Sequence, residues 1–288
     1  DIFLVNSDGY TDEKKRLCEE NNVELVVLER IPEEGLPARS SSGSKRELKF
    51  PYRVCIAGGW MDQPWVSEKH PGSVVVAQIW PTIDFNDRSG MATSSRKVAM
   101  ELWGDEYPGG DPVRNAGLLF GAENPPGSEY ISGTQDHIGL LVPGVSRLDY
   151  NGKYWPANIE NTADPETCEW LSEVLNFVPL IPRPEGYNPI AKRNLDPKIV
   201  KRLGESGKAC YDAILKKDAA QLGFSMKESF LAWDELLPNT VPDWVMEEME
   251  KNYFPKYSGA ITSGSGGGYI VFPSEEPVKD ALKIKVKY

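Results

Sequence analysis

The sequence is poor in the residues that build most metal centres and disulfide frameworks. Its 288 residues include two histidines and four cysteines, and no pair of cysteines has C-x-x-C spacing. This scarcity excludes a histidine-based metal site and favours buried, reduced thiols in a cytoplasmic protein. No apolar run approaches the ~18–20 residues that a membrane-spanning helix needs.

The chain also lacks an excess of positive charge. Lysine and arginine number 32 against 43 acidic residues, which gives a formal net charge of -11. A surface of this sign argues against nucleic acid or an anionic membrane as the main partner. It does not exclude a phosphorylated small molecule, because a few backbone amides and one or two cations can bind one locally.

No regular repeat of a barrel or a solenoid is present, and strand and helix patterns alternate irregularly, so the sequence predicts an α+β fold. A Pro-, Gly- and Ser-rich connection at 30–48 separates the first three elements from the rest. Helices are expected over most of the C-terminal third and over 11–22, 96–103 and 115–122. Strands are expected over 1–6, 23–28, 52–59, 73–85, 137–150, 173–183, 268–272 and 281–288.

The stretch "RSGMATSSRKVAMELW", residues 88–103, has the composition of an anion site at the start of a helix. Gly90 can adopt backbone angles closed to other residues, and Thr93, Ser94 and Ser95 supply hydroxyls. The first amides of a helix and the positive end of its dipole favour anions. Serine and threonine are also ordinary helix caps, so this stretch alone leaves both interpretations open.

Two further stretches place glycines where a ligand or another backbone could come close. "RVCIAGGWMDQP", residues 53–64, is a strand that ends on two glycines and is followed by Asp62. "SGSGGGYIVF", residues 263–272, places four glycines and two serines before a strand. Each glycine costs roughly 0.5–1 kcal/mol of stability relative to alanine, which a close approach would explain. A tight turn or a hairpin loop is the alternative for either stretch.

Two carboxylates lie near these motifs. In "SGTQDHIG", residues 132–139, Asp136 follows a glycine turn and precedes an apolar run, so we expect it at a strand entrance beside a loop. A carboxylate there could accept a proton from a substrate hydroxyl. Glu123 directly follows the helix expected over 115–122 and so lies at the end of that helix. It could share Mg²⁺ with a hydroxyl and a phosphate, because this ion is usually held by few protein ligands.

Taken together and in their order along the chain, the four motifs resemble those of the GHMP kinase superfamily. The resemblance is to its sugar-kinase branch, of galactokinase, fucokinase and heptose kinase type. The resemblance covers residues 52–288. It implies a two-domain α+β fold, with a shortened N-terminal α/β domain at 48–145 and a C-terminal α+β domain at 146–288. It also implies ATP-dependent phosphorylation of a monosaccharide hydroxyl, with ATP and Mg²⁺ as cofactors.

The resemblance further implies roles for the charged residues. Asp136 corresponds to the catalytic aspartate, the base for the substrate hydroxyl. Arg53 corresponds to an arginine that stabilises developing charge. Ser94 corresponds to the serine that helps to hold Mg²⁺, and Glu123 is its expected partner carboxylate.

The remaining assignments concern the substrate and the phosphates. Asp62 corresponds to the residue that binds sugar hydroxyls in the sugar-kinase branch, and Trp60 beside it offers an aromatic face for a sugar ring or for core packing. The expected phosphate- and nucleotide-binding residues are Gly90, Ala92, Thr93, Ser94, Ser95, Arg96, Gly264, Gly266 and Gly267.

Residues 1–47 are similar to the second half of a cytidylyltransferase-type nucleotidyltransferase, whose serine-rich segment resembles the one that follows Arg39. The H-x-G-H signature of that family is absent from this chain. We therefore expect the chain alone not to transfer nucleotides. An upstream nucleotidyltransferase domain in a longer protein is an open alternative.

The sequence departs from the superfamily pattern in three places. Only 32 positions separate Gly58 from Gly90, where relatives carry a longer segment with the adenine pocket. Ala92 replaces a usual glycine or serine, and Arg96 replaces a small residue. The guanidinium of Arg96 could reach phosphate oxygens or occupy their space.

Because of these departures, two alternatives to a kinase stay open. One is a kinase-inactive protein that binds a sugar or sugar phosphate and serves as a regulatory or assembly module. The other is an enzyme of this fold that acts on a sugar phosphate without ATP. In each case the expected partner is a small-molecule sugar or sugar phosphate, with neither nucleic acid nor a membrane, and a homodimer remains open.

Overall fold

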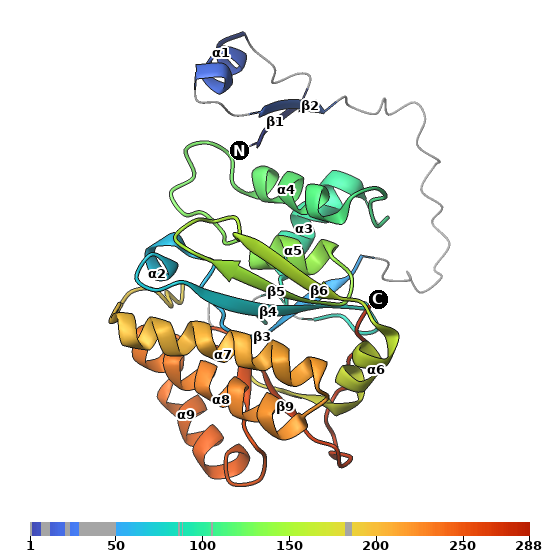
Figure 1. Ribbon diagram of the computed structural model, residues 1–288, viewed down its shortest axis with the longest axis vertical. Coiled ribbons are helices and arrows are strands. Elements are labelled where there is room, and N and C mark those ends of the chain that lie inside the picture. Colours follow the sequence, from blue (N-terminus) through green and yellow to red (C-terminus); the bar gives the residue numbers. More distant parts are fainter. Residues whose placement is uncertain are drawn as a thin grey trace.

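A four-stranded antiparallel sheet lies at the centre of the structure, with the strand order β3-β4-β5-β6 (Figure 1). The structure is a computed structural model that describes residues 2–6, 12–20, 24–28, 50–85, 87, 89–104, 106–181 and 186–288. Helices cover both faces of this sheet, and two of its strands, β3 and β4, are buried along nearly their whole length. The four strands are Tyr52–Ala57 (β3), Gly72–Ile79 (β4), Val145–Tyr150 (β5) and Asn158–Thr162 (β6).

Three helices cover one face of this sheet (Figure 1). They are α3 (Thr93–Trp103), α4 (Pro112–Glu123) and α5 (Gln135–Leu141). The shortest of them, α5, packs directly on β3 and β4, and α4 packs on α5. A fourth short helix, α2 (Pro64–Ser67), connects β3 to β4.

Two long helices, α7 (Pro197–Leu215) and α8 (Ala219–Leu236), lie on the opposite side of the sheet (Figure 1). The helices predicted in this part of the chain are confirmed, and each buries one apolar face. Small residues bring α7 against β4: a Cβ on Gly204 would lie 2.6 Å from the Cα of Gly72, and one on Gly207 would overlap the carbonyl oxygen of Ser73. The buried faces contain Val200, Leu203, Gly207, Cys210 and Ile214 on α7, and Met226, Phe230, Trp233 and Leu237 at α8.

A second antiparallel sheet, with the order β7-β9-β8, completes the C-terminal part. Its strands are Leu175–Pro179 (β7), Ile261–Gly264 (β8) and Gly267–Pro273 (β9). Helix α6 (Pro165–Val174) precedes β7, and α9 (Asp243–Glu248) continues into a π-helical turn, Met249–Tyr253. The β8–β9 hairpin contains the third glycine motif, and β8 contacts β3.

The predicted strand, helix and strand at the N-terminus are confirmed as β1 (Ile2–Asn6), α1 (Asp12–Glu20) and β2 (Glu24–Leu28). The two strands pair in parallel. The predicted connection at 30–48 lies outside the described residues.

Four predictions about secondary structure need correction. The strand expected over 73–85 ends at Ile79. The strand expected over 137–150 begins as helix α5 and becomes strand β5 only at Val145. The strand expected over 173–183 is the end of α6 followed by β7. The strand expected over 281–288 contributes isolated bridges, from Leu282 to Phe177 and from Val286 to Ile79.

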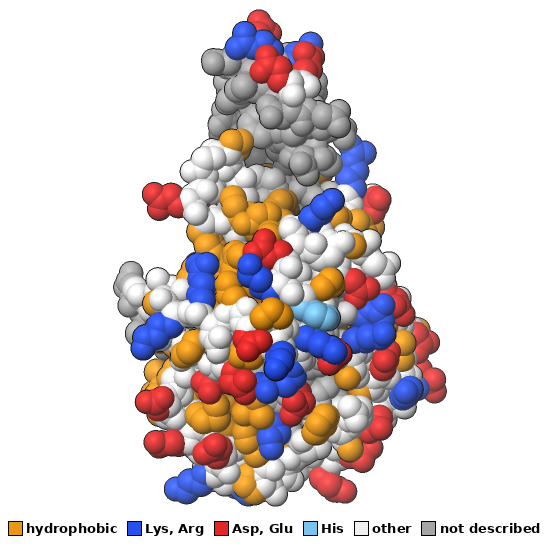
Figure 2. Space-filling view, turned by 60° about the vertical axis from the view of Figure 1, so that its left-hand side comes forward, with side chains coloured by type: hydrophobic (Ala, Val, Ile, Leu, Met, Phe, Trp, Pro, Cys, Tyr) orange, Lys and Arg blue, Asp and Glu red, His pale blue; other side chains and the backbone are white. Residues whose placement is uncertain are grey.

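The predicted domain boundary between 145 and 146 falls at the first residue pair of β5. The central sheet therefore takes strands from both sides of that boundary. On the face that Figure 2 shows, acidic and basic side chains are interspersed over the described part of the surface. Among the helices that the structure describes, none is long and apolar enough to cross a membrane.

Candidate active site

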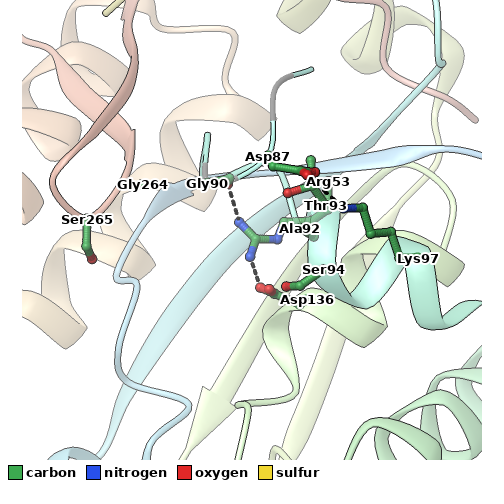
Figure 3. A pocket seen from close by; sticks show the side chains of 10 residues that line it. All are labelled: Arg53, Asp87, Gly90, Ala92, Thr93, Ser94, Lys97, Asp136, Gly264 and Ser265. Atoms are coloured by element: carbon green, nitrogen blue, oxygen red, sulfur yellow. Dashed lines mark hydrogen bonds and ion pairs between the residues drawn. The ribbon is translucent and has the colours of Figure 1, made fainter. Parts of the chain in front are cut away.

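Two adjoining cavities open at the end of β3, and they share the residues around Asp136. The first, called the loop cavity here, has a volume of about 420 Å³. The second, called the Asp62 cavity, has a volume of about 250 Å³. The loop cavity is lined by Arg53, Asp87, Gly90, Ala92, Thr93, Ser94, Lys97, Asp136, Gly264 and Ser265 (Figure 3). The residues that line both cavities are Arg53, Gly90, Ser94, Asp136, Gly264 and Ser265.

The floor of the loop cavity is the turn before α3. Gly90 has a φ of 75°, and Ala92 adopts the left-handed conformation with a φ of 55°. Helix α3 begins at Thr93, its N-cap residue makes no side-chain cap, and its first i to i−4 bond runs from the amide of Arg96. The amides at the first positions of a helix have no partner inside the helix, so the turn presents them as donors for an anion.

The third glycine motif supports this turn by direct contact between the two backbones. A Cβ on Gly264 would lie 2.6 Å from the Cα of Gly90. The hydroxyl of Ser263 donates a hydrogen bond to the carbonyl of Ser89 and accepts one from the amide of Tyr269 at 3.0 Å. The hairpin thus holds the loop in its shape.

Two glycines predicted to bind phosphate belong to the turn of the hairpin instead. Gly266 and Gly267 have φ values of 80° and 146°, and neither lines the two cavities. The amide of Gly266 donates to the carbonyl of Thr240 at 2.7 Å. Their backbone freedom serves the tight β8–β9 turn, while Gly264 and Ser265 form the cavity wall.

Asp136 and Arg53 form an ion pair where the two cavities meet (Figure 3). Arg53 comes from β3 and is buried, and its second terminal nitrogen donates to the carbonyl of Gly90 at 3.3 Å. Its stem passes over Gly139 of α5, where a Cβ would overlap the arginine Cγ. Asp136 lies in the first turn of helix α5, and not at a strand entrance as predicted. The ion pair with Arg53 holds its carboxylate where both cavities meet.

Asp62 lines the second cavity and is almost completely buried. It accepts hydrogen bonds from the side-chain amide of Gln135 at 3.0 Å and from its backbone amide at 3.4 Å. Burial raises the pKa of Asp62 to about 6, and the hydrogen bonds from Gln135 and the charge of Arg53 limit the rise. Gly133 lies directly against the carboxylate, in a place where a Cβ would overlap it.

Aromatic side chains surround the Asp62 cavity. Trp60 lines it, has a positive φ of 80° and lies 6.2 Å from the Trp65 ring. Tyr130 and Trp233 also line this cavity. The indole nitrogen of Trp233 donates to the carbonyl of Gly59 at 2.9 Å, so helix α8 fixes the first glycine motif.

Glu123 and Ser94, the predicted Mg²⁺ ligands, do not line a common cavity among these two. Ser94 lines both cavities, whereas Glu123 lines neither. One carboxylate oxygen of Glu123 lies 2.7 Å from Nε2 of the buried His137, and the other accepts from Ser132 at 3.3 Å. Burial opposes ionisation of Glu123, but these hydrogen bonds and the His137 ring lower its pKa overall. The described residues contain no group of three or more His, Cys, Asp or Glu that could hold a metal ion.

The prediction that Arg96 reaches phosphate oxygens is wrong for this structure. Its guanidinium is buried and donates to the carbonyl of Phe50 at 2.9 Å and to that of Pro51 at 3.2 Å. It also stacks over the Tyr52 ring, 4.1 Å from the ring centroid. Ser95, its neighbour, is completely buried and lines neither cavity, although it was predicted to bind phosphate.

The structure thus gathers most of the predicted site residues and adds several that the sequence did not single out. Arg53, Asp62, Asp136 and the loop around Gly90 meet at the two cavities. Some of the additional residues lie inside the quoted motifs at positions that the sequence did not distinguish, whereas Asp87, Tyr130 and Trp233 lie outside every motif, so only the tertiary fold identifies them. They are Asp87, Lys97, Tyr130, Gln135, Gly139, Trp233 and Ser265.

The described residues adopt the fold of the GHMP kinases. Mevalonate kinase from Methanococcus jannaschii has a TM-score of 0.55 and 14% identity, covering 83% of this chain and 97% of that one. Mevalonate kinase from L. major has a TM-score of 0.54 and 11% identity, covering 85% and 96%. A Campylobacter jejuni protein assigned as a sugar kinase has a TM-score of 0.52 and 13% identity, covering 82% and 94%. No family model and no curated protein sequence matches the chain.

Proposed function

We propose that this protein is a GHMP-type sugar kinase, which transfers the terminal phosphoryl group of ATP to a hydroxyl of a monosaccharide. The observation that carries this proposal is the meeting of the two cavities at Asp136. One cavity offers helix amides for phosphates, and the other offers a buried carboxylate and aromatic rings for an acceptor. Phosphoryl transfer depends mainly on such positioning and on charge stabilisation.

In this proposal Asp136 is the catalytic residue. Its carboxylate accepts the proton of the acceptor hydroxyl as the new bond to phosphorus forms. Arg53 is a positioning residue, since it joins Asp136 to the carbonyl of Gly90 in the phosphate loop. Asp62 accepts a hydrogen bond from a second hydroxyl of the acceptor.

The charges of the Asp62 cavity support a neutral, hydroxyl-rich acceptor. Among the lining residues that the structure describes, Arg53 is the one basic side chain, and it is paired with Asp136. A carboxylate on the acceptor would meet Asp62 and Asp136 without a matching cation, which is costly in a buried site. Aromatic faces such as that of Trp60 suit the apolar face of a sugar ring.

Mg²⁺ accompanies ATP in the superfamily that the chain resembles and would neutralise phosphate charge during transfer. Glu123 is bonded to His137 and lines neither cavity, so no ligand role in such a site is assigned to it. No step is therefore assigned to a protein-bound metal. The loop amides and Ser94 are the groups available to the donor phosphates.

The test is product formation, observed by phosphorus NMR. The protein is incubated with Mg²⁺–ATP and with neutral pentoses, hexoses or heptoses, and separately with mevalonate. We expect a new phosphomonoester signal with at least one neutral sugar and none with mevalonate. Phosphorylation of mevalonate, or ATP consumption that yields no phosphomonoester with any sugar, would contradict the proposal.

A further inference from the structure

The strand within the segment that leads from the first motif to the phosphate loop belongs to the core of the fold. Between Gly58 and Gly90 it contains α2, β4 and a connection that begins after Ile79. All residues of β4 except the first are buried in the central sheet. The connection 80–90 is therefore the part of this segment that could face a donor.

The aromatic residue of that connection closest to the loop is already packed. Phe85 is buried, and its ring meets Tyr52 and Tyr269 edge-on with centroid distances of 5.0 and 5.4 Å. The hydroxyl of Tyr52 donates to Asp84 at 2.8 Å, which closes the cluster under the loop. These three rings are committed to the core and offer no face to a purine.

Among the described lining residues of the loop cavity, none provides a surface suited to a nucleoside base. Its described lining residues comprise small side chains, hydroxyls and charged groups, with none aromatic and none aliphatic beyond alanine. Binding sites for flat organic ligands are mostly apolar and aromatic. The aromatic residues of this site, Trp60, Tyr130 and Trp233, line the Asp62 cavity instead.

The outer side of the loop cavity is polar and open to solvent. Lys97 and Asp87 form an ion pair there at 2.7 Å, and each side chain is 61% exposed. The second pair, Arg53 with Asp136, balances the charge on the inner side. The charges of the two basic and two acidic residues in the described part of the lining cancel, so the backbone amides of the loop and of α3 remain there as the anion-binding groups. Backbone amides bind phosphate oxygens and do not distinguish one nucleobase from another.

We propose that the donor site recognises the polyphosphate chain of its donor and not the base, so that tripolyphosphate and nucleoside triphosphates of different bases serve alike. This inference rests on the proposed function and defines its donor. In the transfer, the acceptor hydroxyl gives its proton to Asp136, and its oxygen bonds to the terminal phosphorus. The bond from that phosphorus to the bridging oxygen breaks. Pyrophosphate leaves from tripolyphosphate, or a nucleoside diphosphate leaves from a nucleoside triphosphate.

The test is calorimetric titration of the full chain with the Mg²⁺ complexes of tripolyphosphate, ATP and GTP, and with adenosine. We expect the three polyphosphates to bind with dissociation constants within about threefold of one another. Millimolar adenosine should give no heat, and tripolyphosphate should displace ATP. Ser94→Ala, which removes a hydroxyl from the lining without a change of charge, should weaken all three to the same degree.

Two outcomes overturn the inference and differ in what they say of the proposed function. Binding of ATP at least about tenfold tighter than both GTP and tripolyphosphate would mean that the base is recognised. That result removes the inference and leaves the sugar kinase standing. If none of the three polyphosphates binds, the loop is no phosphate site, and the proposed function fails together with the inference.

Discussion

Gly90 and Gly264 meet backbone to backbone, so that a Cβ built on Gly264 would lie 2.6 Å from the Cα of Gly90. The proposed phosphate loop and the β8–β9 hairpin thus support each other through two residues without side chains. Gly264→Ala should push the two segments apart, destabilise the protein by about 1–3 kcal/mol and abolish binding of tripolyphosphate. Denaturant unfolding and calorimetry measure the two effects.

The matched control is Gly109→Ala, because a Cβ at Gly109 would meet nothing within 4 Å. This variant should keep the stability and the binding of the wild type. If Gly264→Ala behaves like Gly109→Ala, the close contact between the two motifs does not determine the shape of the loop.

Gly139→Ala tests whether Arg53 positions the catalytic carboxylate. A Cβ at Gly139 would overlap the Cγ of Arg53, so the variant should displace the guanidinium while it keeps every charge. A displacement of about 1 Å can lower a rate by about 100-fold, and we expect a loss of kcat of that order. Steady-state kinetics provide the measurement.

Gly117→Ala provides the comparison for that experiment, since Gly117 also lies in a helix and its added Cβ would make an ordinary 3.8 Å contact with Trp155. The protein should keep its kcat and gain up to about 1 kcal/mol of stability from helix propensity. A similar kcat in Gly117→Ala and Gly139→Ala would show that the position of Arg53 is unimportant.

Asp62→Asn should stabilise the protein at neutral pH and weaken binding of the acceptor. Burial raises the pKa of Asp62 from 3.8 to about 6, so the folded state favours the protonated carboxyl. The stability from that preference is complete below pH 3.8 and is lost as the pH rises through 6. The variant removes this loss, which amounts to up to about 3 kcal/mol.

Urea unfolding at two pH values separates this cause from simple repacking. The gain from Asp62→Asn should be larger at about pH 7.5 than at about pH 5, because the wild-type carboxyl is more ionised at the higher pH. The KM for the acceptor should rise while donor binding is unchanged. A gain that is equal at both pH values would contradict the assigned pKa.

The Glu123–His137 pair is expected to be structural. Glu123→Ala leaves the buried imidazole without this hydrogen bond and should cost about 1–3 kcal/mol at neutral pH, whereas Glu123→Gln should cost less. The pKa of Glu123 is lowered from its ordinary value of 4.5, so the ionised carboxylate stabilises the folded protein above pH 4.5. This stabilisation is lost as the pH falls and the carboxylate is protonated. The half-saturating Mg²⁺ concentration should be the same in Glu123→Gln and in wild type, and a marked increase would make Glu123 a metal ligand.

Much of this site follows from local sequence. The glycines of the phosphate loop, the carboxylate of Asp62 and the carboxylate of Asp136 each stand in a motif that predicts proximity to a ligand. The structure brings them to two adjoining cavities. The secondary structure around Asp136 was harder to predict, because the short apolar run after it is buried in a helix and lacks a distinguishing period.

The directions of side chains could not be predicted in the same way. Arg96 follows the phosphate loop directly, yet its acceptors are carbonyls 45 and 46 residues earlier in the chain. Glu123 finds His137 across 14 residues, from a different helix. Both side chains satisfy buried partners that only the folded chain brings near, and each therefore turns away from the role its sequence position predicts.

The central claim is that Asp136 performs the transfer step at a phosphate site that forms without it. The most direct test compares kcat with the dissociation constant of tripolyphosphate in Asp136→Asn, with Asp149→Asn, which alters another Arg–Asp pair, as the control. We predict that kcat falls by about 100- to 10,000-fold in Asp136→Asn. Its tripolyphosphate binding should stay within about twofold of wild type, and Asp149→Asn should keep both values. Turnover by Asp136→Asn at the wild-type rate would contradict the account.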